Sequence, residues 1–137
     1  MPEALYNVYL VDDDMEDLQL LAQVFAEAAC ASEVHCFSSI EKLLLQLDAL
    51  PTESLPDIII LDHHMPLLGG DDALQIIRGK ERFSQIAVGI YSTTVQQNKI
   101  ETLLLNGADF YIEKGAMSCR TSRPNQPNDI NIFRFLL

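Results

Sequence analysis

Hydrophobic residues occur in short runs along the chain, and segments of mixed polarity separate these runs. The runs predict five strands, at 7–11, 33–37, 57–61, 87–91 and 109–112. The continuous run Ile58-Ile59-Ile60-Leu61 is typical of a strand buried on both faces of a parallel sheet. Because strand and helix patterns alternate, the sequence predicts an α/β fold: an open, doubly wound parallel sheet with helices on both faces.

The segments between these runs carry apolar residues at helical spacing and polar residues suited to helix ends. Leu18 and Leu21 belong to a first predicted helix, with Asp14 as its N-cap. Ser38-Ser39-Ile40-Glu41 resembles a capping box that opens a second helix. A third helix is predicted at about 71–78. A fourth ends at Asn106-Gly107, a favourable C-cap pair.

The composition describes an ordinary globular chain with a strongly acidic balance. Its 137 residues predict a single domain over 1–137. The net charge of −11 argues against nucleic-acid binding as the main activity. No apolar run is long enough to cross a membrane, and the start has no signal-peptide pattern. Three cysteines without a Cys-x-x-Cys motif are typical of reduced thiols, so we expect a cytoplasmic location without membrane contact.

Polar side chains follow four of the predicted strands at the point where each strand ends. They are Asp12, Asp13, Asp62, Ser92 and Lys114. In open α/β sheets the functional groups lie beyond the carboxyl ends of the strands. Carboxylates about 5 Å apart would repel each other by roughly 3 kcal/mol a pair. A hard divalent cation relieves this repulsion, and oxygen ligands favour Mg²⁺. Asp62 directly follows the buried strand and is the natural nucleophile for an acyl-phosphate.

Four segments of the chain, in order and at matching spacing, carry a family pattern. They are Leu-Val-Asp12-Asp13-Asp14, Asp57-Ile-Ile-Ile-Leu-Asp62-His-His-Met-Pro66-Leu-Leu-Gly69-Gly70, Ile-Tyr-Ser92-Thr and Gly107-Ala-Asp-Phe-Tyr111-Ile-Glu-Lys114. Over 7–114 the chain resembles the receiver domain of two-component response regulators, the CheY-like family. The resemblance implies a flavodoxin-like sheet of five parallel strands in the order 2-1-3-4-5.

The same resemblance implies a role for each matching residue. Asp62 is the phosphoacceptor, and it holds Mg²⁺ together with Asp12, Asp13 and the backbone carbonyl of His64. Ser92 is the switch hydroxyl, and it moves toward the phosphoryl group. Lys114 is the amine that pairs with the phosphoryl group, and Tyr111 is the switch aromatic.

The resemblance also implies partners for a phosphorelay protein. The phosphoryl donor is a histidine kinase or a histidine phosphotransfer protein. The surface of helix four, strand five and helix five then binds a downstream protein that the sequence does not identify. Because the chain has no room for an output domain, we expect a stand-alone regulator that is a switch and not an enzyme.

The segment 115–137 departs from the family pattern. Gly115 stands where the family usually has a proline, and 115–128 shows little apolar periodicity. Only 129–137 remains for a last helix, which would be short and apolar on nearly all sides. The segment carries three Arg and one Asp, which is a charge of +2. Because the net charge of the whole chain is −11, residues 1–114 carry −13. This positive segment could dock on the acidic remainder of its own chain, or it could pair with another subunit, because a short last helix would leave apolar surface exposed. We hypothesise a homodimer through this C-terminal surface.

Two other functions compete with the phosphorylated switch. One is a pseudo-receiver, a scaffold that works without phosphorylation. The other is a metal-dependent phosphohydrolase, since Asp62-His63-His64 matches the signature of the DHH phosphoesterases, although the further motifs of that family are absent. His63 and His64 could suggest a metal pair, but adjacent side chains of an extended chain point opposite ways. We therefore expect both histidines on the surface of a loop.

Overall fold

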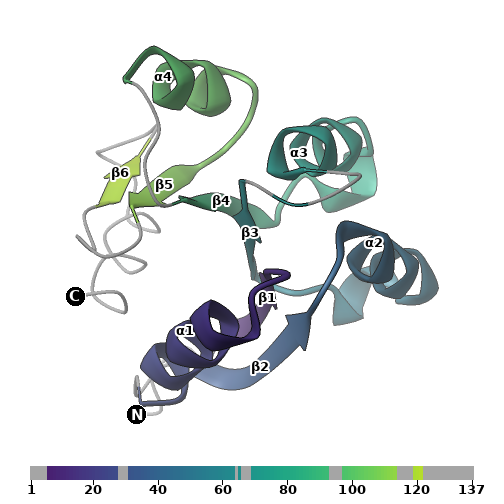
Figure 1. The fold of residues 1–137 in the computed structure, drawn as a ribbon. Coiled ribbons are helices and arrows are strands. Elements are labelled where there is room, and N and C mark those ends of the chain that lie inside the picture. Colours follow the sequence, from purple (N-terminus) through teal and green to yellow (C-terminus); the bar gives the residue numbers. More distant parts are fainter. Residues whose placement is uncertain are drawn as a thin grey trace, which may run out of the picture.

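A six-stranded sheet forms the central layer of the molecule, in the order β2-β1-β3-β4-β5-β6 (Figure 1). The computed structural model describes residues 6–27, 31–63, 65, 69–92, 97–113 and 119–121. The parallel strands are β1 (Tyr6–Val11), β2 (Ala31–Phe37), β3 (Ile58–Asp62), β4 (Ala87–Ser92) and β5 (Phe110–Glu113). Each of them pairs in parallel with its neighbours in this set. The predicted doubly wound sheet with strand order 2-1-3-4-5 is therefore confirmed.

The sixth strand, β6 (Cys119–Thr121), was not predicted. It pairs antiparallel with β5, with Ile112 opposite Cys119 and Phe110 opposite Thr121. A strand of three residues is too short for an alternating apolar pattern, so its sequence gives no periodic signal. The helix predicted at 129–137 and the bond between Lys114 and Gly115 lie outside the described residues.

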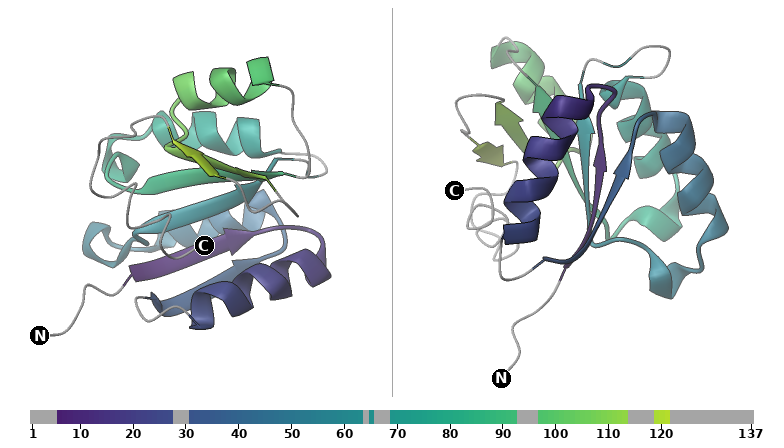
Figure 2. Two further views of the ribbon diagram at one scale, coloured as in Figure 1. Left: turned by 90° about the vertical axis from the view of Figure 1, so that its left-hand side faces the viewer. Right: turned by 60° about the horizontal axis from the view of Figure 1, so that its bottom comes forward.

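Helices cover both faces of the sheet (Figure 2). They are α1 (Met15–Glu27), α2 (Ile40–Ala49), α3 (Gly70–Arg78) and α4 (Gln97–Leu105), with short 3₁₀ helices η1 (Thr52–Ser54) and η2 (Glu81–Phe83). Leu18 and Leu21 of α1 pack in one core cluster, against residues such as Ile60. The buried side chains of α2, α3 and α4 pack in a second cluster on the opposite face. Among the helices that the structure describes, none is long and apolar enough to cross a bilayer.

The helix ends follow the local sequence closely. Asp14 Oδ1 accepts hydrogen bonds from the backbone N–H groups of Glu16 at 2.9 Å and Asp17 at 3.2 Å, which confirms the predicted cap of α1. The cap of α2 is Ser39, whose Oγ accepts from the Lys42 backbone N–H at 3.2 Å. The predicted capping box, which placed Glu41 three residues after the cap, is therefore wrong by one residue.

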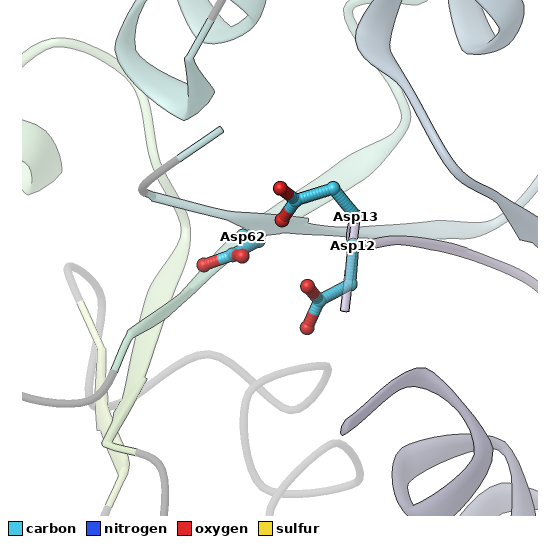
Figure 3. A group of neighbouring side chains, drawn as sticks. All are labelled: Asp12, Asp13 and Asp62. Carbon is cyan, nitrogen blue, oxygen red and sulfur yellow. The ribbon is translucent and has the colours of Figure 1, made fainter. Parts of the chain in front are cut away.

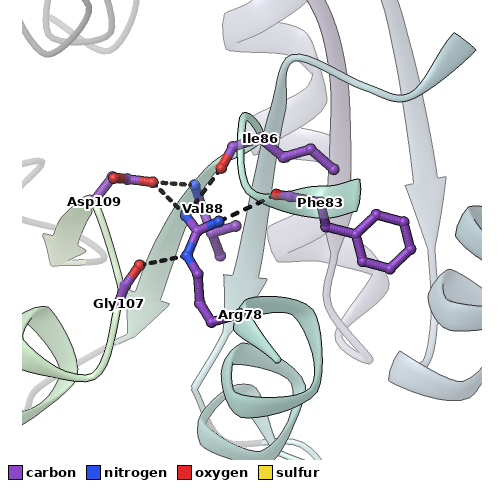
Figure 4. Close-up of polar contacts among 6 residues, drawn as sticks. All are labelled: Arg78, Phe83, Ile86, Val88, Gly107 and Asp109. Atoms are coloured by element: carbon purple, nitrogen blue, oxygen red, sulfur yellow. Dashed lines mark hydrogen bonds and ion pairs between the residues drawn. The ribbon is translucent and has the colours of Figure 1, made fainter. Parts of the chain in front are cut away.

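The loop between α4 and β5 is joined to the end of α3 by Arg78 (Figure 4). The guanidinium donates to the carbonyl oxygens of Gly107 at 2.8 Å and Ile86 at 2.9 Å, and it pairs with Asp109 at 2.7 Å. Asp109 also accepts from the backbone N–H of Val88 at 2.8 Å. We call these contacts the Arg78 network. It lies at the amino ends of β4 and β5.

Candidate functional site

Three carboxylates meet at the carboxyl ends of β1 and β3 (Figure 3). Asp12 and Asp13 follow β1, and Asp62 is the last residue of β3. One carboxylate oxygen from each residue lies within 4.8 Å of the others. Asp12 is 1% exposed and Asp62 is 5% exposed, whereas Asp13 is open to solvent. The structure thus brings together the three acidic residues that the sequence singled out; we call them the carboxylate cluster.

Backbone groups hold Asp12 in place within the cluster. Its N–H donates to the carbonyl of Phe37 at 3.1 Å, which ties the residue to the end of β2. Its Oδ1 accepts from the backbone N–H of Asp14 at 2.9 Å. The same Asp14 begins α1 as its N-cap. The turn from β1 into α1 therefore sets the direction of the Asp12 carboxylate.

Asp62 is held from the other side by the start of α3. Gly70, the first residue of this helix, lies against the backbone that follows β3. A Cβ atom at Gly70 would lie 2.9 Å from the carbonyl oxygen of Asp62 and 3.2 Å from the Cα of His63. Such an approach leaves no room for a side chain, so glycine is required where α3 contacts Asp62.

The structure corrects the prediction for His63. Its side chain is 8% exposed instead of lying on the loop surface, and its Nε2 is 2.7 Å from Oδ1 of Asp71. This contact joins the residue after Asp62 to the first turn of α3. The sequence shows an acidic residue, Asp71, in the first turn of α3. Periodicity alone does not reveal that this residue contacts His63.

Two of the remaining predicted site residues lie on neighbouring strands, and two lie outside the described residues. Ser92 ends β4 and is fully buried, and its Oγ has no hydrogen-bond partner among the described residues. It follows Tyr91, which lies opposite Asp62 in the β3–β4 ladder. Tyr111 is in the middle of β5 and is 2% exposed. His64 and Lys114 are the two that the structure does not describe.

The family of the chain follows from comparison with known proteins. The model of the response regulator receiver domain matches residues 8–119. The chain therefore belongs to the receiver domain family of two-component response regulators. The sheet order and the carboxylate cluster agree with this assignment. Receiver domains of this family bind Mg²⁺ or Mn²⁺ in an acidic pocket and interact with histidine kinases or phosphotransfer proteins.

Individual relatives are distant in sequence. The two-component response regulator ORR1 of Oryza sativa subsp. japonica is 27% identical over 116 residues, which cover 82% of this chain and 50% of that protein. The chain thus spans half the length of this relative. The phosphorylated cyanobacterial phytochrome response regulator RcpA superposes with a TM-score of 0.73 at 22% identity, covering 97% of this chain and 89% of that one. The Mn²⁺-bound form of response regulator Rcp1 gives 0.72 at 18% identity, covering 96% and 88%.

The carboxylate cluster fits a hard divalent cation. All three side chains offer oxygen ligands, and these are the ligands that Mg²⁺ prefers. Two of the three are buried, and a buried carboxylate needs a compensating charge or hydrogen bonds. At separations of 4.8 Å or less each pair would repel by at least about 3 kcal/mol at an effective dielectric constant of about 20. A doubly charged ion at the centre would remove most of this repulsion.

Proposed function

We propose that the chain is a phosphorylated switch of a two-component phosphorelay, with Asp62 as the phosphoacceptor. The donor is a phosphohistidine on a histidine kinase or a histidine phosphotransfer protein. In the transfer, an oxygen of the Asp62 carboxylate forms a bond to phosphorus while the phosphorus–nitrogen bond of the donor breaks. The imidazole of the donor keeps the electron pair. The product is an acyl-phosphate on Asp62, formed once per molecule, so the chain acts as a switch and not as an enzyme.

The observation that carries this proposal is the convergence of three carboxylates at one edge of a receiver-family sheet. Asp12, Asp13 and Asp62 would hold Mg²⁺, with the His64 carbonyl as a further ligand. When bound, this ion neutralises charge on the transferring phosphoryl group. The chain's own contribution is to position Asp62, which the end of β3 and the start of α3 hold from two sides.

Ser92 supports the proposal from the next strand. A buried hydroxyl without a hydrogen-bond partner costs about 1–3 kcal/mol relative to a satisfied one. A phosphoryl oxygen on Asp62 would supply a hydrogen-bond acceptor close to the Ser92 hydroxyl. The two residues are near each other because Tyr91, which precedes Ser92, lies opposite Asp62 in the sheet. Phosphorylation would then draw the end of β4 toward Asp62. Lys114 would pair with the phosphoryl group, and Tyr111 would report the change on β5 to a downstream protein.

Incubation with acetyl phosphate and MgCl₂, followed by intact mass spectrometry, tests the proposal. We expect the mass of one phosphoryl group on the wild-type chain and none on Asp62→Asn. Chelation of Mg²⁺ with EDTA should also abolish the adduct. The matched control is Asp57→Asn, the same chemical change at an exposed residue just before β3, and this variant should be phosphorylated like the wild type.

Each other outcome would contradict the proposal in a recognisable way. A folded wild-type chain that takes up no phosphoryl group would favour the scaffold function. An adduct that persists in Asp62→Asn would place the phosphoacceptor elsewhere. Repeated turnover of a phosphoester substrate, instead of a single modification, would favour the phosphohydrolase.

A further inference from the structure

His63, the residue directly after the phosphoacceptor, makes three contacts that fix its position. Its backbone N–H donates to the carbonyl of Tyr91 at 3.0 Å, so the β3–β4 ladder continues one residue beyond Asp62. Its carbonyl accepts from the N–H of Gly70 at 3.3 Å. Its ring Nε2 lies 2.7 Å from the Asp71 carboxylate. Backbone donor, backbone acceptor and side chain are thus all engaged.

Two of these three contacts come from the first turn of α3, since Gly70 and Asp71 are its first two residues. The close approach of Gly70 to the Asp62 carbonyl keeps this turn against the end of β3. The Asp71 side chain is 60% exposed, whereas the His63 side chain that its carboxylate contacts is 8% exposed. The start of α3 therefore packs closely against the backbone of Asp62 and is bonded to the backbone and the side chain of His63.

The geometry points to His63 and Asp71 as positioning residues for the divalent-cation site. Their contact holds the backbone at Asp62 before any cation arrives, and it also holds the point from which the chain continues to His64, the predicted carbonyl ligand. Neither side chain belongs to the carboxylate cluster. The contact exists with a neutral or a charged imidazole, because the Nε2–H can donate in both forms. The inference rests on the proposed function, since it concerns the cation that the phosphorylation requires.

The expected signature is a change in cation affinity without a change in the transfer step. If the pair prepares the site, its loss should weaken Mg²⁺ binding, because part of the binding free energy must then restore the backbone position at Asp62 and His63. Once Mg²⁺ is saturating, the site is formed and the rate of phosphorylation should be unchanged. If the pair only stabilises the start of α3, its loss should lower the stability of the fold and leave the Mg²⁺ affinity as it was.

Two variants of Asp71 separate the contact from the charge. Asp71→Ala and Asp71→Asn both remove one negative charge near the site, but the asparagine keeps an oxygen that accepts from Nε2–H. MgCl₂ titrations of the full chain at constant ionic strength, followed by amide NMR shifts, give the dissociation constant of each variant. We expect it to be about tenfold higher in Asp71→Ala than in Asp71→Asn, as is typical for partners outside the ligand set. Phosphorylation rates from acetyl phosphate at saturating Mg²⁺ should agree within about twofold.

The outcomes distinguish this inference from the proposed function. Equal dissociation constants in the two folded Asp71 variants would overturn the inference alone. A wild-type chain that binds Mg²⁺ but takes up no phosphoryl group would overturn the proposed function alone, because the binding comparison would still stand. A wild-type chain with no saturable Mg²⁺ binding would overturn both. Asp71 is exposed, and its substitution leaves the core untouched, so folding of the variants is expected and is checked by the same spectra.

Discussion

Gly89 occupies a position in β4 where a side chain would collide with the neighbouring strand. A Cβ atom there would lie 2.1 Å from Cε2 of Phe110 and 2.2 Å from its Cζ. Phe110 is 0% exposed, so its ring is enclosed in the core and cannot turn out into solvent. We expect Gly89→Ala to lower the free energy of unfolding by about 1–3 kcal/mol, the usual range for overpacking a core. Equilibrium unfolding in urea measures this loss.

A double-mutant cycle shows whether the Phe110 ring is the cause. Phe110→Leu shortens the side chain that the new methyl group would meet. In this background the alanine at Gly89 should cost less, with a coupling energy of about 1 kcal/mol or more. If the alanine is equally destabilising in both backgrounds, backbone conformation and not the ring determines the need for glycine.

Single residues of the site differ in how far the sequence predicts them. The carboxylate cluster could be predicted, because Asp12, Asp13 and Asp62 each follow an apolar run that has to be a strand, and parallel strands end at one edge of a sheet. The buried ring of His63 could not. Its environment depends on where α3 begins relative to β3, which periodicity leaves open by a residue or more, and one residue of helix turns a side chain by about 100°.

At the scale of elements, the Arg78 network joins the end of α3 to β4 and to the segments that lead into β4 and β5. The side chains of Arg78 and Asp109 are 20% and 21% exposed, so their pair is much less screened by water than a surface pair. We expect Arg78→Ala to lower the free energy of unfolding by about 2–4 kcal/mol, because the partly buried carbonyls of Gly107 and Ile86 lose a side-chain donor and the Asp109 carboxylate loses its charged partner. The variant should still take up a phosphoryl group, because the network lies at the amino ends of the strands and Asp62 lies at a carboxyl end.

The matched control for Arg78 is another cation close to η2. Lys80 pairs with Asp48 at 3.0 Å, and the two side chains are 43% and 54% exposed. Lys80→Ala should therefore cost less than about 1 kcal/mol in the same urea experiment. A similar loss in both variants would mean that burial does not distinguish the two pairs. Loss of phosphorylation in a folded Arg78→Ala protein would contradict the separation of the network from the site.

The order and type of the elements were predictable, and their exact ends were less so. All five predicted runs are parallel strands in the structure. The reason is clearest for β3, whose run Ile58–Leu61 is buried throughout, as is typical of a strand covered on both faces. The predicted limits of the strands differ from the observed ones by one or two residues. β6 escaped prediction because its place in the sheet depends on pairing with β5 and not on any pattern of its own. The capping serine of α2 was misplaced by one residue because Ser38 and Ser39 are both good caps.

The whole molecule separates two tasks along the length of its strands. The amino ends of β4 and β5 carry the Arg78 network, whose positive charge meets partly buried acceptors. The carboxyl ends of β1 and β3 carry the carboxylate cluster, which concentrates negative charge in a chain of net charge −11. At the amino ends, the charge of Arg78 is thus compensated by groups of the fold itself. The other end holds charge that a cation would compensate, so the stability of the fold should respond to Mg²⁺.

Magnesium ions should therefore raise the thermal stability of the whole chain. At a free Mg²⁺ concentration of about ten times the dissociation constant, binding to the folded state alone contributes about 1.4 kcal/mol, or roughly 3–6 °C in Tm for a domain of this size. Asp13→Asn should behave in the opposite way. It removes repulsion from Asp12 and Asp62 and so should raise the Tm without Mg²⁺, while the rise on adding Mg²⁺ should largely disappear. Differential scanning calorimetry at constant ionic strength measures both effects, and an equal rise with NaCl would show that screening, and not a bound ion, relieves the cluster.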